Sequence, residues 1–148
     1  MSDKLKHKAI DLLSRRDHST AELANKLVQK GYNREDFGSL FQELTQAGYL
    51  DDSRFAESYI RWRREKGFGP ERIALELASK GVSDSIIAVH IDFTDNAWLN
   101  EALRVKNKHF KNQSIKDFKV KAKQMRFLKY RGFTSDHIQR AFGEVEIE

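Results

Sequence analysis

The amino-acid sequence predicts an all-α protein, an elongated array of three tandem three-helix repeats with nine helices. Glycines recur at a regular spacing, follow amphipathic stretches and precede helix-capping residues. No segment shows a sustained two-residue alternation of apolar and polar side chains, so no strand is expected. Each unit is too small to bury a stable core alone, and we therefore expect neighbouring units to pack on each other.

Three glycines mark the ends of equivalent helices. They are Gly31, Gly81 and Gly132, which lie 50 and 51 residues apart, each after a cation and before an apolar residue. A glycine in the left-handed conformation ends a helix and lets the next apolar residue contact the last turn. The predicted contacts join Leu27 with Tyr32, Leu77 with Val82, and Leu128 with Phe133.

A new helix is expected to start after each of these glycines. Asn33, Ser83 and Thr134 carry side chains that can accept hydrogen bonds from the free amides of a first turn. Four residues further on, an apolar side chain can pack back on the residue that follows the glycine, as in a hydrophobic staple. The side chains at this position are Phe37, Ile87 and Ile138.

The remaining helix ends are recognisable in the same way. We expect the first helix from about Lys4 to Arg16, and Ser19 with Glu22 forms a capping box for the second. Asp51 is the predicted N-cap of the fourth helix, whereas a glycine-rich turn and a proline at position 70 separate the fourth from the fifth. The last four helices are expected near 83–91, 94–110, 115–131 and 134–142.

The glycine spacing also predicts the domain organisation. Repeat 1 covers residues 4–47, repeat 2 covers 51–91, repeat 3 covers 94–142, and an acidic tail follows over 143–148. Because the helix ends are expected to be capped by residues of the same repeat, nothing indicates an obligate dimer, and we expect a monomer. Nowhere do 18 apolar residues follow one another, so we expect no membrane partner and a cytoplasmic location.

The sequence offers no arrangement typical of an enzyme. The absence of cysteine excludes disulfides and thiolate metal sites, and the five histidines include no pair at ligand spacing on one helix face. Walker and HExxH sequences are absent, and helix capping explains Asp51 and Asp52. We therefore expect no catalytic residue, no metal and no cofactor, and an enzyme is the least supported class of function.

Positive charge is concentrated in one predicted helix. The net charge of +5 favours a partner with negative charge without identifying nucleic acid. Residues 104–131 contain eleven lysines and arginines against the single acid Asp117, a repulsion that a polyanion would relieve. One stripe at steps of three or four residues is formed by Lys116, Lys119, Lys123, Arg126 and Tyr130. The neighbouring arc, expected in the interior, contains Phe118, Ala122, Met125 and Leu128.

A second basic surface is expected on the fourth helix. Its cations are Arg54, Arg61, Arg63, Arg64 and Lys66. They suit contact with phosphate or carboxylate, although an ordinary solvated helix face would also explain them. Trp62 falls in the apolar arc of this helix, so we expect it in the core rather than on the surface as a platform for stacking bases.

The sequence resembles the bacterial RecX family, whose members bind filaments of the RecA recombinase and restrain them. The resemblance rests on GYLDDSRFA at 48–56, KGFGP at 66–70, KGVS at 80–83 and FLKYRGF at 127–133. With shorter matches near the start, it covers roughly residues 9–142. It implies a modular chain of three-helix repeats, which the glycine spacing indicates independently.

The resemblance also implies a function. The protein would be a non-enzymatic negative modulator, a curved array lying in the groove of the RecA–single-stranded DNA filament and inhibiting its recombinase, ATPase and coprotease activities. Its partners would be the RecA filament and single-stranded DNA, met directly or through RecA. The alternative is a helix-turn-helix-like DNA-binding module that acts without RecA. Binding to naked DNA phosphate would weaken steeply with added salt, whereas filament binding would require RecA.

Overall fold

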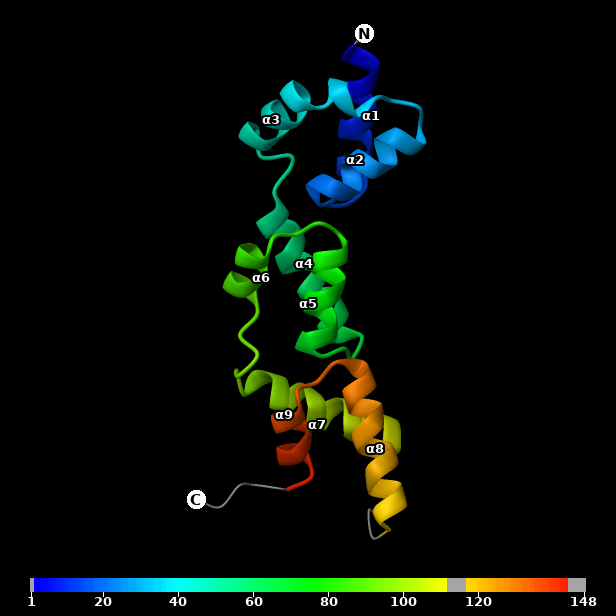
Figure 1. The fold of residues 1–148 in the computed structure, drawn as a ribbon, viewed down its shortest axis with the longest axis vertical. Helices are drawn as coiled ribbons and strands as arrows, with labels where there is room; N and C mark the ends of the chain where they lie inside the picture. The colour runs from blue at the N-terminus through cyan, green and yellow to red at the C-terminus, as the bar shows by residue number, and fades with distance from the viewer. Residues whose placement is uncertain (1, 112–116, 144–148) are drawn as a thin grey trace. The chain divides into compact units, whose positions relative to one another are not determined.

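Helices account for the regular structure of this chain. The computed structural model describes residues 2–111 and 117–143, and within them it contains nine α helices, one short 3₁₀ helix and no strand (Figure 1). The α helices are α1 (Ser2–Arg15), α2 (Thr20–Gln29), α3 (Gly38–Gln46), α4 (Asp52–Glu65), α5 (Pro70–Ser79), α6 (Asp84–His90), α7 (Ala97–Phe110), α8 (Phe118–Arg131) and α9 (Ser135–Ala141). The 3₁₀ helix η1 (Arg34–Asp36) precedes α3. The predicted all-α class is confirmed.

The chain forms two compact units. Unit 1 contains the described residues up to Tyr59 together with Leu77–His90, and unit 2 contains Ile60–Glu76 together with the described residues from Ile91 onward. The division runs through α4 and α5, so each of these helices contributes to both units. No helix in the described chain combines the length and the apolar character that crossing a bilayer requires.

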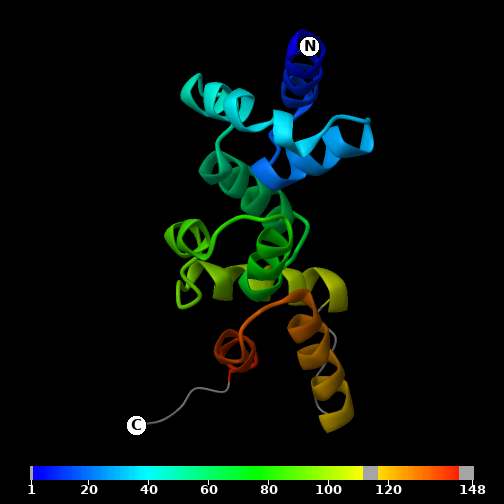
Figure 2. The ribbon, with the colours of Figure 1, turned by 45° about the horizontal axis from the view of Figure 1, so that its top comes forward.

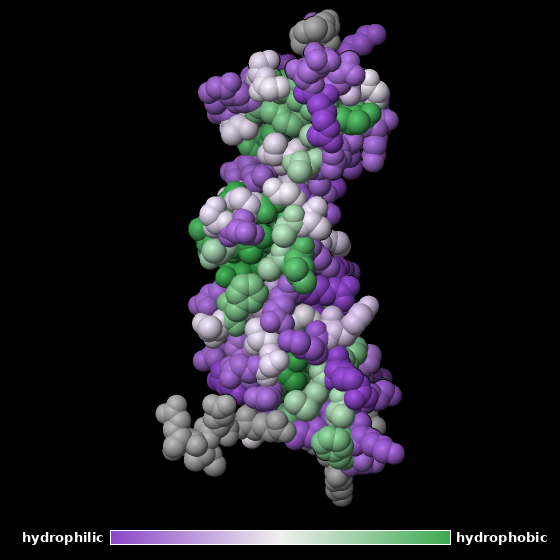
Figure 3. Space-filling view, in the orientation of Figure 1, coloured by the Kyte–Doolittle hydropathy of each residue, from purple (hydrophilic) through white to green (hydrophobic). Residues whose placement is uncertain are grey.

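The core of unit 1 lies among α1, α2 and α3. Its buried side chains come from every turn of these helices and from the segment before α4: Leu5, Ala9, Leu12, Leu23, Ala24, Leu27, Phe37, Leu40, Leu44 and Leu50. In unit 2, α7, α8 and α9 pack together (Figure 2). Their buried residues include Trp98, Ala102, Val105, Leu128, Ile138 and Ala141. Hydrophilic side chains cover much of the face drawn in Figure 3.

The predicted glycine stops are confirmed. Gly31, Gly81 and Gly132 have φ angles of 96°, 82° and 100°, the left-handed conformation that glycine adopts without strain. The amide after each glycine donates a hydrogen bond of 3.1–3.2 Å to the predicted leucine carbonyl, in the pairs Tyr32 to Leu27, Val82 to Leu77 and Phe133 to Leu128. All three leucines are fully buried, so each stop also places a side chain in the core.

Four of the five predicted side-chain caps are confirmed. Ser19 and Glu22 form the capping box of α2, Asp51 accepts from the amides of Ser53 and Arg54, and Ser83 and Thr134 cap α6 and α9. The prediction for Asn33 is wrong, because its side chain makes no capping hydrogen bond. The residues that follow it form η1, and α3 begins only at Gly38. Phe37 is 5% exposed and stacks on Phe41, so its burial places the start of α3 about one turn after the position predicted from Asn33.

Two predicted core side chains lie on the surface. Trp62 is 50% exposed, since the covered position on α4 belongs to Arg63, which pairs with Glu76 and lies over the Phe68 ring. Phe118 is 82% exposed. Burial along this face of α8 increases from this first residue, through the half-buried Ala122 and Met125, to the fully buried Leu128, so the end of the helix is packed more tightly than its start.

A helix-end contact recurs in both units. In unit 1 the hydroxyl of Ser19 at the start of α2 donates to the carbonyl of Lys80 at the end of α5, at 2.7 Å. In unit 2 the amide of Gly69 at the start of α5 donates to the carbonyl of Arg131 at the end of α8, also at 2.7 Å. The two donors, Ser19 and Gly69, lie 50 residues apart, and the two acceptors, Lys80 and Arg131, lie 51 residues apart. These are the same spacings that separate the glycine stops.

Glu22 forms the capping box with Ser19 and also pairs with Lys80, the residue whose carbonyl accepts from the Ser19 hydroxyl. Burial raises the pKa of this carboxyl, but hydrogen bonds from Arg16 and the Ser19 amide, with the charges of Arg16 and Lys80, lower the pKa to a net value below its ordinary 4.5. A carboxyl with a depressed pKa stabilises the fold above its unfolded pKa, and this stabilisation is lost as the pH falls through the folded pKa.

Glu22→Gln is expected to lower the free energy of unfolding by roughly 1 kcal/mol at pH 7. Glutamine retains the capping-box geometry but loses the ion pairs with Arg16 and Lys80. Urea denaturation of both proteins at pH 7 and at pH 3 measures the difference, which should be smaller at pH 3 because a larger fraction of the wild-type carboxyl is then protonated. An equal difference at both values would show that the charge of Glu22 contributes nothing.

Candidate anion-binding surface

One face of α8 presents the predicted basic stripe. At about 100° per helical residue, Lys119, Lys123, Arg126 and Tyr130 lie within one narrow arc. All four are exposed, Tyr130 by 72%. The fifth predicted member, Lys116, lies outside the described residues.

The charges of this stripe are not neutralised within the described chain. No carboxylate there forms an ion pair with Lys119, Lys123 or Arg126. Asp117, the one acid between residues 104 and 131, instead accepts from the amide of Lys119 at 2.8 Å and caps the helix. Three cations separated by one or two turns therefore repel each other, and a row of phosphates or carboxylates would lower that repulsion.

Two of the predicted cations on α4 have structural partners. In unit 1, Arg54 pairs with Asp17 at 3.2 Å and donates to the carbonyls of Gly48 and Tyr49, which ties α4 to the turn before it. In unit 2, Arg63 makes two hydrogen bonds of 2.8 Å to Glu76 and its side chain is only 15% exposed. The geometry therefore explains both arginines without an external partner.

The other three cations, Arg61, Arg64 and Lys66, are exposed near the end of α4. The carbonyl of Arg64 accepts from Arg104 of α7 at 3.0 Å, and that of Lys66 accepts from Arg131 of α8 at 3.1 Å. These two bonds bring further cations to the end of α4. This meeting of cations was not predicted from the sequence, because the partners lie 40 and 65 residues apart along the chain.

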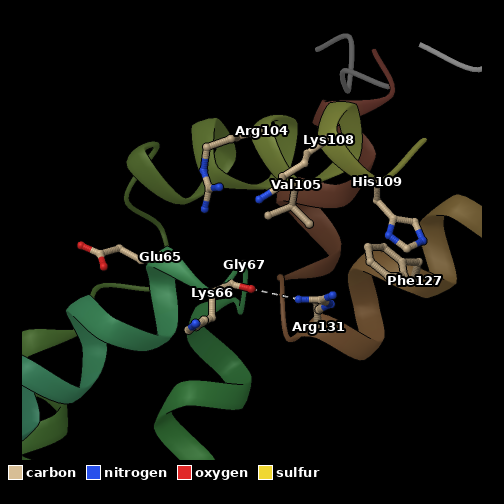
Figure 4. A pocket seen from close by; sticks show the side chains of 9 residues that line it. All are labelled: Glu65, Lys66, Gly67, Arg104, Val105, Lys108, His109, Phe127 and Arg131. Atoms are coloured by element: carbon tan, nitrogen blue, oxygen red, sulfur yellow. Dashed lines mark hydrogen bonds between the residues drawn. The ribbon is translucent and has the colours of Figure 1, made fainter. Parts of the chain in front are cut away.

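A pocket of about 260 Å³ lies at this meeting point (Figure 4). It is lined by Glu65, Lys66 and Gly67 of the α4–α5 connection, Arg104, Val105, Lys108 and His109 of α7, and Phe127 and Arg131 of α8. The lining thus contains four cations and one carboxylate. Lys66 is the one lining residue among the predicted site residues, and only the high density of cations between 104 and 131 could have indicated the others.

Aromatic rings form one side of this pocket. The rings of His109 and Phe127 stack with centroids 3.9 Å apart at 19°, and Phe110 meets both of them edge-on. The guanidinium of Arg131 lies 4.9 Å from the centroid of the Phe127 ring. The basic and aromatic sides of the pocket therefore meet at Arg131. No group of three histidines or carboxylates in the described residues could hold a metal ion.

Models of three protein domains match the chain. They describe the first three-helix domain of RecX at residues 6–37, the second at 51–89 and the third at 99–142. Regulatory protein RecX of Legionella pneumophila (strain Corby) is 41% identical over 138 residues, which cover 93% of this chain and 92% of that protein. The protein of the same name from Vibrio vulnificus (strain CMCP6) is 43% identical over 139 residues, covering 94% of this chain and 91% of that protein.

Solved structures show the same fold. The crystal structure of RecX from Lactobacillus salivarius superposes with a TM-score of 0.81 at 23% sequence identity, covering 95% of this chain and 94% of that one. A further crystal structure, of a regulatory protein RecX, gives a TM-score of 0.79 at 24% identity and covers 94% of this chain.

Proposed function

We propose, because this chain belongs to the RecX family, that it is a non-enzymatic negative modulator of the RecA recombinase. It binds in the groove of the RecA–single-stranded DNA filament and inhibits the recombinase, ATPase and coprotease activities of that filament. The relatives named above are regulatory proteins, which supports a regulatory role. The three-helix repeats at 4–47, 51–91 and 94–142 serve as modules of a cytoplasmic monomer without cofactor.

The observation that carries this proposal is the unneutralised stripe on α8. A RecA filament on single-stranded DNA combines a phosphate backbone with a protein surface, and the exposed cations Lys119, Lys123 and Arg126 suit either kind of negative charge. Tyr130 continues the stripe with a large amphipathic ring, a side-chain type enriched at binding interfaces.

The direct test is the ATPase of RecA on single-stranded DNA with increasing amounts of this protein. Inhibition at ratios well below one protein per RecA is expected if the protein acts on filaments. An ATPase that stays unchanged at every ratio would refute the proposal. Binding to naked DNA that falls steeply with salt, with no effect on RecA, would support the helix-turn-helix-like alternative instead.

The stripe is tested by the triple variant Lys119→Glu, Lys123→Glu, Arg126→Glu. Because three attractive contacts become repulsive, the concentration that half-inhibits the ATPase is expected to rise by roughly tenfold or more, while the circular dichroism spectrum stays the same.

The matched control makes the same change in net charge in unit 1, with Lys4→Glu, Lys26→Glu, Lys30→Glu. This variant should inhibit as the wild type does. If the folded stripe variant inhibits as well as the control, the α8 stripe has no part in the mechanism.

A further inference from the structure

We infer that the pocket lined by α7, α8 and the end of α4 is a nucleotide-binding subsite, which takes one phosphate on its basic side and the attached base on the His109–Phe127 rings. This inference rests on the proposed function in expecting nucleic acid as a partner. It adds a defined place on unit 2 where one nucleotide is held.

The basic side has donors that remain available for a phosphate. Arg104 is engaged by Glu101 and the Arg64 carbonyl, and one terminal nitrogen of Arg131 donates to the Lys66 carbonyl. Lys66 and Lys108 form no side-chain ion pair within the described residues. In Figure 4 the side chains of Arg104, Lys108 and Arg131 extend toward one space, from which the Glu65 carboxylate points away. This arrangement concentrates positive charge where an anion can enter.

Gly67 provides the room for Arg131. A Cβ atom at this position would lie 3.2 Å from the Nη1 atom of Arg131 and 3.3 Å from the Cγ2 atom of Val105. The glycine also has a φ angle of 92°, which ends α4 and turns its last carbonyls toward the guanidinium. The helix stop thus places a planar donor group, the type best suited to phosphate oxygens, at the pocket wall.

The aromatic side suits a base. His109 is exposed and stacks on Phe127, while Phe110 fixes the edges of both rings, so the imidazole forms the outer layer of an ordered stack. Bases of single strands bind to such aromatic platforms without regard to sequence. The volume of about 260 Å³ is small for a drug-sized ligand and suits a single nucleotide.

The pocket is also continuous with the stripe. Phe127 follows Arg126 directly and lies one helical turn after Lys123, so a strand whose phosphates follow the stripe reaches the pocket without leaving α8. A free nucleotide has the same chemistry, and the experiment below distinguishes the two sources.

The test measures the fluorescence anisotropy of a labelled oligothymidylate and of an abasic oligomer of equal length, without RecA. Lys108→Gln is expected to weaken binding of both oligomers by roughly fivefold, since each loses a phosphate contact. His109→Ala is expected to weaken binding of oligothymidylate by about tenfold and to leave the abasic oligomer unaffected. The controls are the exposed Lys30→Gln and His7→Ala in unit 1, which should bind as the wild type does.

Unlabelled competitors identify the source of the nucleotide. Displacement by thymidine monophosphate or ATP at concentrations similar to those of the oligomer assigns the pocket to free nucleotides, and displacement by oligothymidylate alone assigns it to a strand. Displacement by oligoglutamate as effective as displacement by oligothymidylate, unchanged binding by both pocket variants, or equal losses in the controls would overturn the inference. RecA ATPase inhibition by the wild type, measured in parallel, keeps a failure of the pocket distinct from a failure of the proposed function.

Discussion

Phe133→Ala is expected to lower the free energy of unfolding by about 3–5 kcal/mol, the usual cost of removing a fully buried phenylalanine ring. Phe133 is completely buried, and its amide closes the glycine stop of α8 by donating to Leu128. The ring packs where α8 turns toward α9, so neighbouring side chains cannot fill the space without moving a helix end. Urea denaturation followed by circular dichroism measures the loss.

Phe118→Ala is the matched control for this variant. It removes the same kind of ring at the first residue of α8 rather than just after the glycine stop of that helix, but Phe118 is 82% exposed, and a change within about 0.5 kcal/mol is expected. Similar losses for the two variants would mean that the start of α8 is packed as tightly as the segment that follows its end.

Gly132→Ala is expected to cost about 2–5 kcal/mol, because two separate penalties combine. The first is conformational, since the φ angle of 100° is one that alanine rarely adopts. The second is steric, since the new Cβ atom would lie 2.3 Å from the Cβ atom of Arg72 and 2.6 Å from its backbone nitrogen. The start of α5 would have to move away from the end of α8.

Gly31→Ala separates these two penalties. Gly31 has a similar φ angle of 96°, but no atom beyond Gly31 and its two chain neighbours lies within 4 Å of the position its Cβ would take. Only the conformational cost of about 1 kcal/mol is expected. Thermal or urea denaturation of both variants measures the difference, and equal costs would show that the close approach of α5 to Gly132 adds no steric penalty.

The helix ends could be predicted because their chemistry is local. A glycine stop requires a left-handed residue and an apolar residue next to it, and both are visible within six positions, as at Leu77 to Val82. Asn33 shows the limit of this reasoning. Its side chain could have capped a helix, but the burial of Phe37 against Phe41 decided where α3 starts, and burial depends on the tertiary fold.

The candidate site was predictable to the same extent. The α8 stripe follows from residue spacing on one helix, and its described members are exposed as expected. The pocket combines residues from three helices, such as Lys66 and Arg131, whose proximity only the packing of the helices creates. The exposure of Trp62 and the partial burial of Arg63 have a similar origin. Arg63 is covered because it pairs with Glu76, which lies on another helix.

The recurring helix-end contact has an electrostatic consequence. The amides that open α5 donate to the carbonyls that close α8, and the hydroxyl that caps α2 donates to a carbonyl that closes α5. The positive end of one macrodipole therefore meets the negative end of another, first from α2 to α5 and again from α5 to α8. Deleting α8 would leave the Gly69 and Glu71 amides without acceptors, so the loss of one three-helix domain would loosen the domain before it.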